Sequence, residues 1–299
     1  MSLLLEHIEK HPKETKRLLG IDYEQIQQLF TQGEALHYQN QALIEGSKFR
    51  LNSKGAGCKP KLCLRDQMLL TLVYLSQLHT FQYLGVQFGV SESTANNIFH
   101  YWLDIFTELL PATLLEQVKK KDSDLECVKE ILTQYELTVD SAEQPIERPG
   151  THEEQKKFFS GKQKNYTLKN QFIVLPLGED LVDITVGDPG PKSDINQFRE
   201  SLPKFAPNQK FKGDKAYLGE DQIAIPHKKP KNQELTLSQK QENKEFSASR
   251  IFVEHIIRLI KLFRVAQERF RLNREIYEQV IFAVCGLVRL RIGALFLSV

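Results

Sequence analysis

Three acidic residues have neighbours in the sequence that favour a reactive site. Asp140 directly follows a run of Glu-Leu-Thr-Val, in which Thr and Val favour a short strand. Asp214 ends a second short strand-like run and precedes a turn. Glu254 lies in an amphipathic helical stretch, with Arg250 one turn before it and Lys261 two turns after it on the same face. Carboxylate oxygens of this kind suit Mg²⁺ or Mn²⁺.

Each of these acids also has an ordinary explanation when it is taken alone. A single Asp after a strand commonly forms an Asx turn or caps a helix. A Glu flanked by bases on a helix is commonly part of a surface ion-pair ladder, which contributes little stability. As a set, three carboxylates brought together would repel one another without a cation. Two strand-end aspartates and one helical glutamate therefore favour a metal site more strongly than any one of them does.

Basic residues are gathered in segments, although the net charge of the whole chain is only +2. Lysine runs are often solvated surfaces, but separate clusters with flanking aromatic residues favour an anionic partner. The four clusters occupy residues 47–61, 156–169, 225–231 and 258–274.

Composition describes an ordinary globular protein, with 41% hydrophobic and 26% charged residues. Four scattered cysteines are too few for a disulfide framework, and Cys58 with Cys63 would be half of a metal site that has no second pair. Free thiols in a reducing cytosol are therefore expected. The N-terminal stretch contains acids and histidines, unlike a signal peptide. The apolar C-terminal run is interrupted by Glu278, Arg289 and Arg291, which favours a buried helix over a membrane span.

The first 110 residues have helical periodicity and contain a candidate helix-turn-helix. A helix is predicted to end near Phe88 at Gly89, and Ser91 can cap the next one. That second helix would turn Tyr101, Trp102 and Ile105 inward. An ordinary helical hairpin is the alternative. Small polar and amide side chains suit contacts with DNA bases and phosphates, and the second helix would present Ser93, Thr94, Asn96, Asn97 and His100.

The second half of the chain changes character and predicts an α/β fold with a mixed sheet. Turn residues 177–180 separate two strand-like runs, which predicts a hairpin. Residues 192–203 predict a helix before the next strand, and the last 55 residues return to helix. Strand-like runs occupy residues 136–140, 170–177, 180–188, 211–217 and 223–227.

Five motifs, taken in order, resemble those of a known family. They are FQYLGVQFGVSESTANNIF, VDSAEQPIERP, FFSGKQKNYTLK, GDKAYLG and RIFVEHIIRLIK. Together they resemble the insertion-sequence transposases with an N-terminal helix-turn-helix and an Asp-Asp-Glu (DDE) catalytic domain of ribonuclease-H-like fold. The resemblance covers nearly the whole chain. It implies a ribonuclease-H-like mixed sheet flanked by helices, preceded by an all-α helix-turn-helix domain.

The resemblance also implies an organisation and a localisation. Residues 1–110 would form the helical DNA-binding domain, with the helix-turn-helix at about 64–109. Residues 111–135 would form a helical connector, and residues 136–299 the DDE catalytic domain. A bacterial cytoplasmic, nucleoid-associated protein is expected, without a membrane partner.

The resemblance assigns roles to individual residues. Asp140, Asp214 and Glu254 would be catalytic and would bind two divalent ions, Mg²⁺ or Mn²⁺. One ion would activate water or a 3′-hydroxyl, and the other would stabilise the leaving oxygen. The partners would be double-stranded DNA, both element ends and target, and further copies of the chain in a homodimer or larger synaptic assembly. For the bases, DNA contact and a solvated surface both stay open; they are Arg250, Lys261, Lys162, Lys164 and Lys169.

Two other functions remain as alternatives. One is a catalytically impaired relic that acts as a DNA-binding protein, and the other is a metal-dependent endonuclease without strand transfer. Ser247 stands where the family often has tyrosine, and Tyr166 where histidine is common, which favours the relic weakly. Other acids near the motifs are expected to be surface or turn residues, namely Glu143, Glu147, Asp183 and Asp188.

Overall fold

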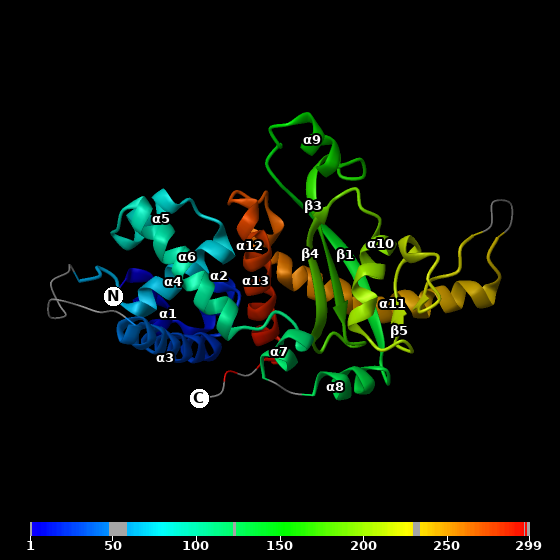
Figure 1. Ribbon diagram of the computed structural model, residues 1–299, viewed down its shortest axis with the longest axis horizontal. Helices are drawn as coiled ribbons and strands as arrows, with labels where there is room; N and C mark the ends of the chain where they lie inside the picture. Colours follow the sequence, from blue (N-terminus) through cyan, green and yellow to red (C-terminus); the bar gives the residue numbers. More distant parts are fainter. Residues whose placement is uncertain (1, 48–58, 122–123, 230–233, 296, 298–299) are drawn as a thin grey trace.

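The computed structural model describes residues 2–47, 59–121, 124–229, 234–295 and 297, and its N-terminal part is helical, as predicted (Figure 1). Ser91 caps a helix as the sequence predicts, because its side chain accepts from Thr94 N, and Asp22 N donates to the Gln25 side chain at the start of another helix. The helices are α1 (Leu3–Lys10), η1 (Pro12–Glu14), α2 (Thr15–Leu19), α3 (Tyr23–Ser47), α4 (Leu64–Gln77), α5 (Phe81–Phe88) and α6 (Glu92–Leu109).

A mixed sheet follows, and its strand order is β4-β3-β1-β5-β6, with β2 beside β3. Strand β1 is antiparallel to β3 and parallel to β5, and β5 is parallel to β6. This is the ribonuclease-H-like sheet that the sequence predicts, including the β3–β4 hairpin. The strands are β1 (Glu136–Pro145), β2 (Phe159–Ser160), β3 (Asn165–Val174), β4 (Leu181–Pro189), β5 (Lys210–Lys212) and β6 (Ile223–Ala224).

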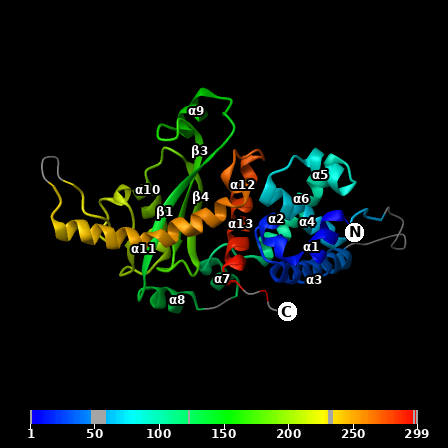
Figure 2. The same cartoon turned by 180° about the vertical axis from the view of Figure 1, so that it is seen from behind.

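Helices cover both faces of the sheet, and α11 crosses one of these faces, in front of the strands in the view of Figure 2. The predicted helix at 192–203 is present as α10 and η2. The helices of this half are α7 (Leu114–Lys120), α8 (Leu125–Leu132), α9 (His152–Phe158), α10 (Asp194–Ser201), η2 (Leu202–Lys204), η3 (Lys215–Tyr217), α11 (Leu237–Lys261), α12 (Arg264–Gln267), η4 (Arg274–Ile276) and α13 (Tyr277–Arg291).

One prediction about β1 is wrong, because the strand does not stop at Asp140. It continues to Pro145, and Asp140 pairs with Phe172 in the middle of an unbroken antiparallel register with β3. The residues after Asp140 are small or polar, which is typical of a turn, but the ladder with β3 pairs the backbone groups on one side of this segment. Tertiary pairing therefore overrides the weak local strand propensity of this segment.

Side-chain alternation along the central strands divides the core into two parts. Phe172 belongs to a large cluster that includes the N-terminal helices, α11, α12 and α13, whereas the adjacent Ile173 belongs to a second cluster with α10 and β5. Helix α13 lies between the N-terminal helices and the sheet (Figure 1). It packs against α6 on one side and β4 on the other, so one continuous core joins the two halves.

Two predicted features lie near segments that the structure does not describe, the basic cluster 47–61 and the apolar C-terminal run. The basic cluster 47–61 and Cys58 lie largely or wholly outside the described residues. In the described part of the chain, no helix combines the length and apolar character that crossing a membrane requires. The apolar C-terminal run forms the buried helix α13, as predicted.

Arg289 on α13 is fully buried, and all five of its N–H donors have acceptors. Nε and Nη2 donate to the two Asp180 carboxylate oxygens at 2.6 and 2.8 Å. Nη1 donates to the carbonyl oxygens of Pro111 and Thr113, and Nη2 also donates to the Gln117 amide oxygen. The guanidinium therefore ties α13 to the β3–β4 hairpin and to the segment that leaves the N-terminal helices.

Replacing Arg289 with Met should lower the free energy of unfolding by about 3–5 kcal/mol, because Asp180 would remain buried without its partner. Urea unfolding followed by circular dichroism measures the change. The double variant Arg289→Met/Asp180→Leu should recover most of the loss. Arg274→Met is the control, since its ion pair with Glu154 is exposed and should contribute about 0–1 kcal/mol. Equal losses for Arg289→Met and Arg274→Met would contradict this account.

Candidate active site

The pairing of β1 with β5 aligns two of the predicted acids. Thr138 pairs with Lys212 at the last position of this short parallel ladder. Asp140 and Asp214 each lie two residues further along, and Asp214 retains extended backbone angles (φ −81°, ψ −175°). Because side chains alternate along extended chains, both carboxylates lie on the face that carries the Glu136–Lys212 ion pair, 2.8 Å long.

The turn after β5 requires glycine for a steric reason. A Cβ on Gly213 would lie 2.7 Å from side-chain atoms of both Tyr217 and Ile223. The close packing lets Asp214 cap η3, where its Oδ1 accepts a hydrogen bond from Ala216 N at 2.8 Å. The second Asp is therefore fixed at the start of a tight turn, as its sequence context predicts.

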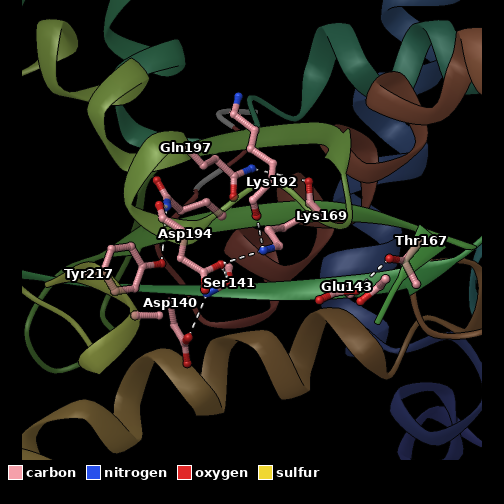
Figure 3. Close-up of polar contacts among 12 residues, drawn as sticks. Asp140, Ser141, Glu143, Thr167, Lys169, Lys192, Asp194, Gln197 and Tyr217 are labelled. Carbon is pink, nitrogen blue, oxygen red and sulfur yellow. Dashed lines mark hydrogen bonds and ion pairs between the residues drawn. The ribbon is translucent and has the colours of Figure 1, made fainter. Parts of the chain in front are cut away.

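Helix α11 supplies the third acid to the same face of the sheet. It packs against β1, and Arg250 Nη2 lies 3.5 Å from Asp140 Oδ2. Glu254 follows Arg250 by one helical turn and therefore projects from the same side of α11. Figure 3 shows Asp140 pointing toward this helix, away from the residues above the strand.

The electrostatics of Asp140 reflect its burial and its neighbours. Burial is the main cause that raises its pKa from 3.8 to about 6. A hydrogen bond from Ser141 N and the positive charge of Arg250 act in the opposite direction, and the negative charges of Asp214 and Glu254 add to the rise. The charges of Asp214 and Glu254 therefore act on the pKa of Asp140 in the same direction as its burial.

A cavity of about 290 Å³ opens beside Asp140. Glu254 and Lys261 line it from α11, and Lys162 lines it from the loop between β2 and β3. Asp214 lies outside its wall. The cavity brings two of the three acids together with three of the bases that the sequence singles out, the third being Lys169.

The remaining predicted bases occupy different environments. Lys164 is exposed in the turn before β3, with a positive φ of 51°. Lys169 departs from the expected exposed DNA contact: it is only 6% exposed, and its Nζ lies 3.0 Å from Asp194 Oδ1. Its ammonium reaches the cavity wall from within the protein.

Asp194 is a polar residue of the site that the sequence interpretation missed. It lines the cavity from the start of α10 and accepts a hydrogen bond from the Ser141 hydroxyl at 2.6 Å. A usable signal was present in β3, where Thr167, Lys169 and Gln171 place polar side chains at alternate positions, on one face of a buried strand. Polar residues with a period of two on a buried strand indicate a polar partner on that face.

The other acids near the motifs were expected at surfaces or in turns, and three of them are not there. Glu143 lines the cavity and accepts a hydrogen bond from the Thr167 hydroxyl at 2.7 Å. Asp183 and Asp188 lie in β4, where Asp183 is buried and paired with Lys204. Glu147 is exposed, as expected. Strands β1 and β4 are longer than their apolar cores, which places these acids in the sheet.

The donor set fits hard divalent cations. Asp140, Asp214 and Glu254 offer only oxygen atoms, the ligands that Mg²⁺ and Mn²⁺ prefer. A buried carboxylate whose pKa is raised by burial and by two like charges gains stability from a nearby cation. Within the described residues, no three His, Cys, Asp or Glu side chains are already gathered as a metal-binding cluster.

The helix-turn-helix has the predicted local structure. Helix α5 ends at Phe88, and Gly89 takes the left-handed conformation (φ 70°) that this turn requires. Ser93, Thr94 and Asn97 are exposed on α6, whereas Asn96 and His100 are half-buried.

The inward orientation predicted for Tyr101 is wrong. Trp102 and Ile105 are buried as expected, but Tyr101 is 38% exposed. Its hydroxyl forms a 2.6 Å hydrogen bond with Nδ1 of the buried His37, which holds the ring at the edge of the core.

Comparisons with known proteins identify both halves of the chain. Residues 139–289 match the family described as DDE superfamily endonuclease, and residues 60–112 match the helix-turn-helix of DDE superfamily endonuclease. The probable transposase for insertion sequence element IS702 of Microchaete diplosiphon is 33% identical over 226 residues. That alignment covers 73% of this chain and 77% of the relative.

Solved structures of Mos1 transposase show a weaker similarity. The Mos1 transposase paired-end complex with left transposon end is 12% identical, with 86% of this chain and 84% of that chain covered and a TM-score of 0.23. The Mos1 mariner paired end complex with Mn is 14% identical, with coverages of 83% and 81% and a TM-score of 0.21. These TM-scores are too low to carry an argument about this chain.

Asp140→Asn should stabilise the metal-free protein at pH 8 by about 1–3 kcal/mol, because a rise in pKa from 3.8 to about 6 corresponds to a carboxylate disfavoured by roughly that amount. The folded protein binds this proton more tightly than the unfolded chain does. Wild type therefore loses stability as the pH rises from about 4 to about 6, and the Asn variant does not.

Urea unfolding in EDTA at pH 4 and pH 8 measures the difference. The gain should be present at pH 8 and absent at pH 4. Glu147→Gln, which removes an exposed acid, is the control and should change neither value. A gain of the same size at both pH values would exclude the titration of Asp140 as its source.

Proposed function

Since the chain belongs to the insertion-sequence transposases with a DDE endonuclease domain and an N-terminal helix-turn-helix, we propose that it binds the inverted repeats at the ends of its element and performs metal-dependent cleavage and strand transfer. Asp140, Asp214 and Glu254 are the proposed catalytic metal ligands. The observation that carries this assignment is the alignment of Asp140 and Asp214, each two residues beyond the last β1–β5 pair, next to a cavity with basic walls that Asp140 and Glu254 line.

The two aspartates are held by contacts that leave acceptor capacity on their carboxylates. Asp140 Oδ1 accepts from Ser141 N, and Asp214 Oδ1 accepts from Ala216 N. A carboxylate has about four lone-pair sites, so each group can still bind a cation. When bound, two divalent ions activate the attacking oxygen and stabilise the leaving oxygen of an in-line displacement.

The bases around the cavity are proposed to hold the DNA backbone. Arg250 Nη2 lies 3.5 Å from Asp140 Oδ2, so its guanidinium would meet a phosphate that is bound beside this carboxylate. Lys261 and Lys162 extend the positive charge along the cavity wall. Exposed Lys164 lies next to Lys162 in the same loop and would follow the backbone further.

The N-terminal domain is proposed to provide sequence recognition. Exposed Ser93, Thr94 and Asn97 begin the second helix of the helix-turn-helix, the part that enters a major groove in this motif. We retain 1–110, 111–135 and 136–299 as the proposed division into DNA-binding domain, connector and catalytic domain. Joining two element ends in one event requires at least two copies of the chain, so a homodimer or a larger assembly is expected.

Asp214→Asn should abolish Mg²⁺-dependent nicking and joining of the element's own end DNA, with a loss of at least about 100-fold, because a metal ligand contributes more than its supporting residues. The amide can still accept from Ala216 N, so the turn should persist. Gel assays on labelled end DNA measure both steps. Asp221→Asn changes an exposed acid on the same segment and should retain wild-type activity.

Other outcomes of this assay would favour the alternatives. Cleavage without joining would indicate an endonuclease. Specific binding without cleavage by wild type would indicate a DNA-binding relic, consistent with Ser247 and Tyr166 at positions where the family often has other residues.

Asn97→Ala and Lys162→Ala should weaken DNA binding in different ways. Loss of an amide that contacts a base should reduce discrimination between the end sequence and random DNA by about 1–3 kcal/mol. Loss of a phosphate contact should weaken binding to both and lower the salt slope by about one. Binding titrations at several salt concentrations measure the two effects. Equal loss on both DNAs for Asn97→Ala would argue against base contact by that residue.

A further inference from the structure

A buried ion pair lies on the opposite side of β1 from the proposed catalytic carboxylates (Figure 3). Lys169 Nζ lies 3.0 Å from Asp194 Oδ1, and the side chains of the two residues are 8% and 19% exposed. The same Asp194 oxygen accepts a hydrogen bond from the Ser141 hydroxyl at 2.6 Å. Gln171 on β3 donates to the Asp194 carbonyl oxygen, which fixes the start of α10 over this face.

The register of the sheet explains why these residues meet. Ser141 is paired with Gln171 and Glu143 with Lys169, so their side chains share the face under α10. Asp140 and its partner Phe172 project from the other face, toward α11. Lys169 is therefore placed to act on Asp194 and Ser141 rather than on the carboxylate of Asp140.

The position of Ser141 gives this contact its importance. Strand β5 pairs with β1 only as far as Thr138, so from Asp140 onward β1 has no strand on that side. Asp194 binds the Ser141 side chain at this open edge and ties it to α10. The backbone N–H of Ser141 in turn donates to Asp140 Oδ1 at 2.8 Å.

We propose that Asp194, held by Lys169, is a positioning residue that fixes Ser141 and thereby the orientation of the Asp140 carboxylate for metal binding. The proposal rests on the proposed function, because it presumes that Asp140 is a metal ligand. Asp194 Oδ1 already accepts from an ammonium and a hydroxyl on the opposite face of the strand, so it supports the site without serving as a ligand. Outer residues of this kind orient ligands and commonly change metal affinity by about 10–100-fold.

Ser141 is the residue to change, because removing either member of a buried ion pair would leave the other charge without a partner. Ser141→Ala removes the hydroxyl and keeps the backbone N–H that Asp140 uses. Ser141→Thr keeps the hydroxyl and suits a strand. Asp140→Asn, which removes the proposed ligand itself, is the reference variant.

Mn²⁺ binding to the DNA-free protein, followed by electron paramagnetic resonance of the free ion, is the main measurement. Ser141→Ala should raise the Mn²⁺ dissociation constant about 10-fold, and Ser141→Thr should restore it. Thermal unfolding in EDTA and binding of end DNA in EDTA should stay at wild-type values for both variants. Asp140→Asn should remove most of the Mn²⁺ binding.

Three results would overturn the proposal, and they differ in what else they reject. Wild-type Mn²⁺ affinity in Ser141→Ala, with binding lost in Asp140→Asn, would reject the positioning role and leave the proposed function intact. Parallel loss of metal binding, stability in EDTA and DNA binding, without rescue by Thr, would show a general structural role. Wild-type Mn²⁺ binding by Asp140→Asn would reject the proposed metal site itself.

Discussion

The short parallel pairing between β1 and β5 is the constraint on which the site depends. It ends at Thr138 and Lys212, and the chain then turns away on the β5 side while β1 continues along β3. Asp140 and Asp214 are aligned because each lies two residues beyond this last pair. The cavity lies in the space left where β5 stops. The unpaired edge of β1 forms part of its wall. A longer β5 would fill that space and pair the edge that α10 now supports.

The surroundings of Asp140 would favour the binding of a cation, and they lower the free energy of unfolding when no cation is bound. The metal-free protein holds Asp140 in a buried place near two other acids, and Arg250 offsets only part of the resulting rise in its pKa. The opposite arrangement is found at Arg289, where a buried charge has every donor satisfied. The charge of Asp140 is only partly balanced by its neighbours, whereas Arg289 joins the two halves of the core. The chain therefore separates the charges of the proposed site from the charges that hold its core together.

Local sequence predicted the helix-turn-helix, the order of the acids and the mixed sheet, because caps, glycines and apolar periodicity are short-range signals. It failed where pairing partners far apart in the sequence decide the outcome. The length of β1 depends on β3, and the surroundings of Lys169 depend on an acid at the start of α10. Tyr101 illustrates a different limit, since its hydroxyl finds His37 across the helical part of the fold. The roles of Asp140, Asp214 and Glu254 remain predictions that their coupled surroundings support.

The place of α13 has a consequence for the order in which the protein can be made. This helix is synthesised after all the others described here, yet its apolar side chains complete a core that α1 begins. During translation the N-terminal helices therefore expose the surface that α13 will cover, and the sheet lacks its neighbour as well. A nascent chain can form local helices but not the joined core. Packing of the N-terminal helices against the sheet thus waits for the synthesis of α13, and a product that lacks α13 would expose this core to proteases.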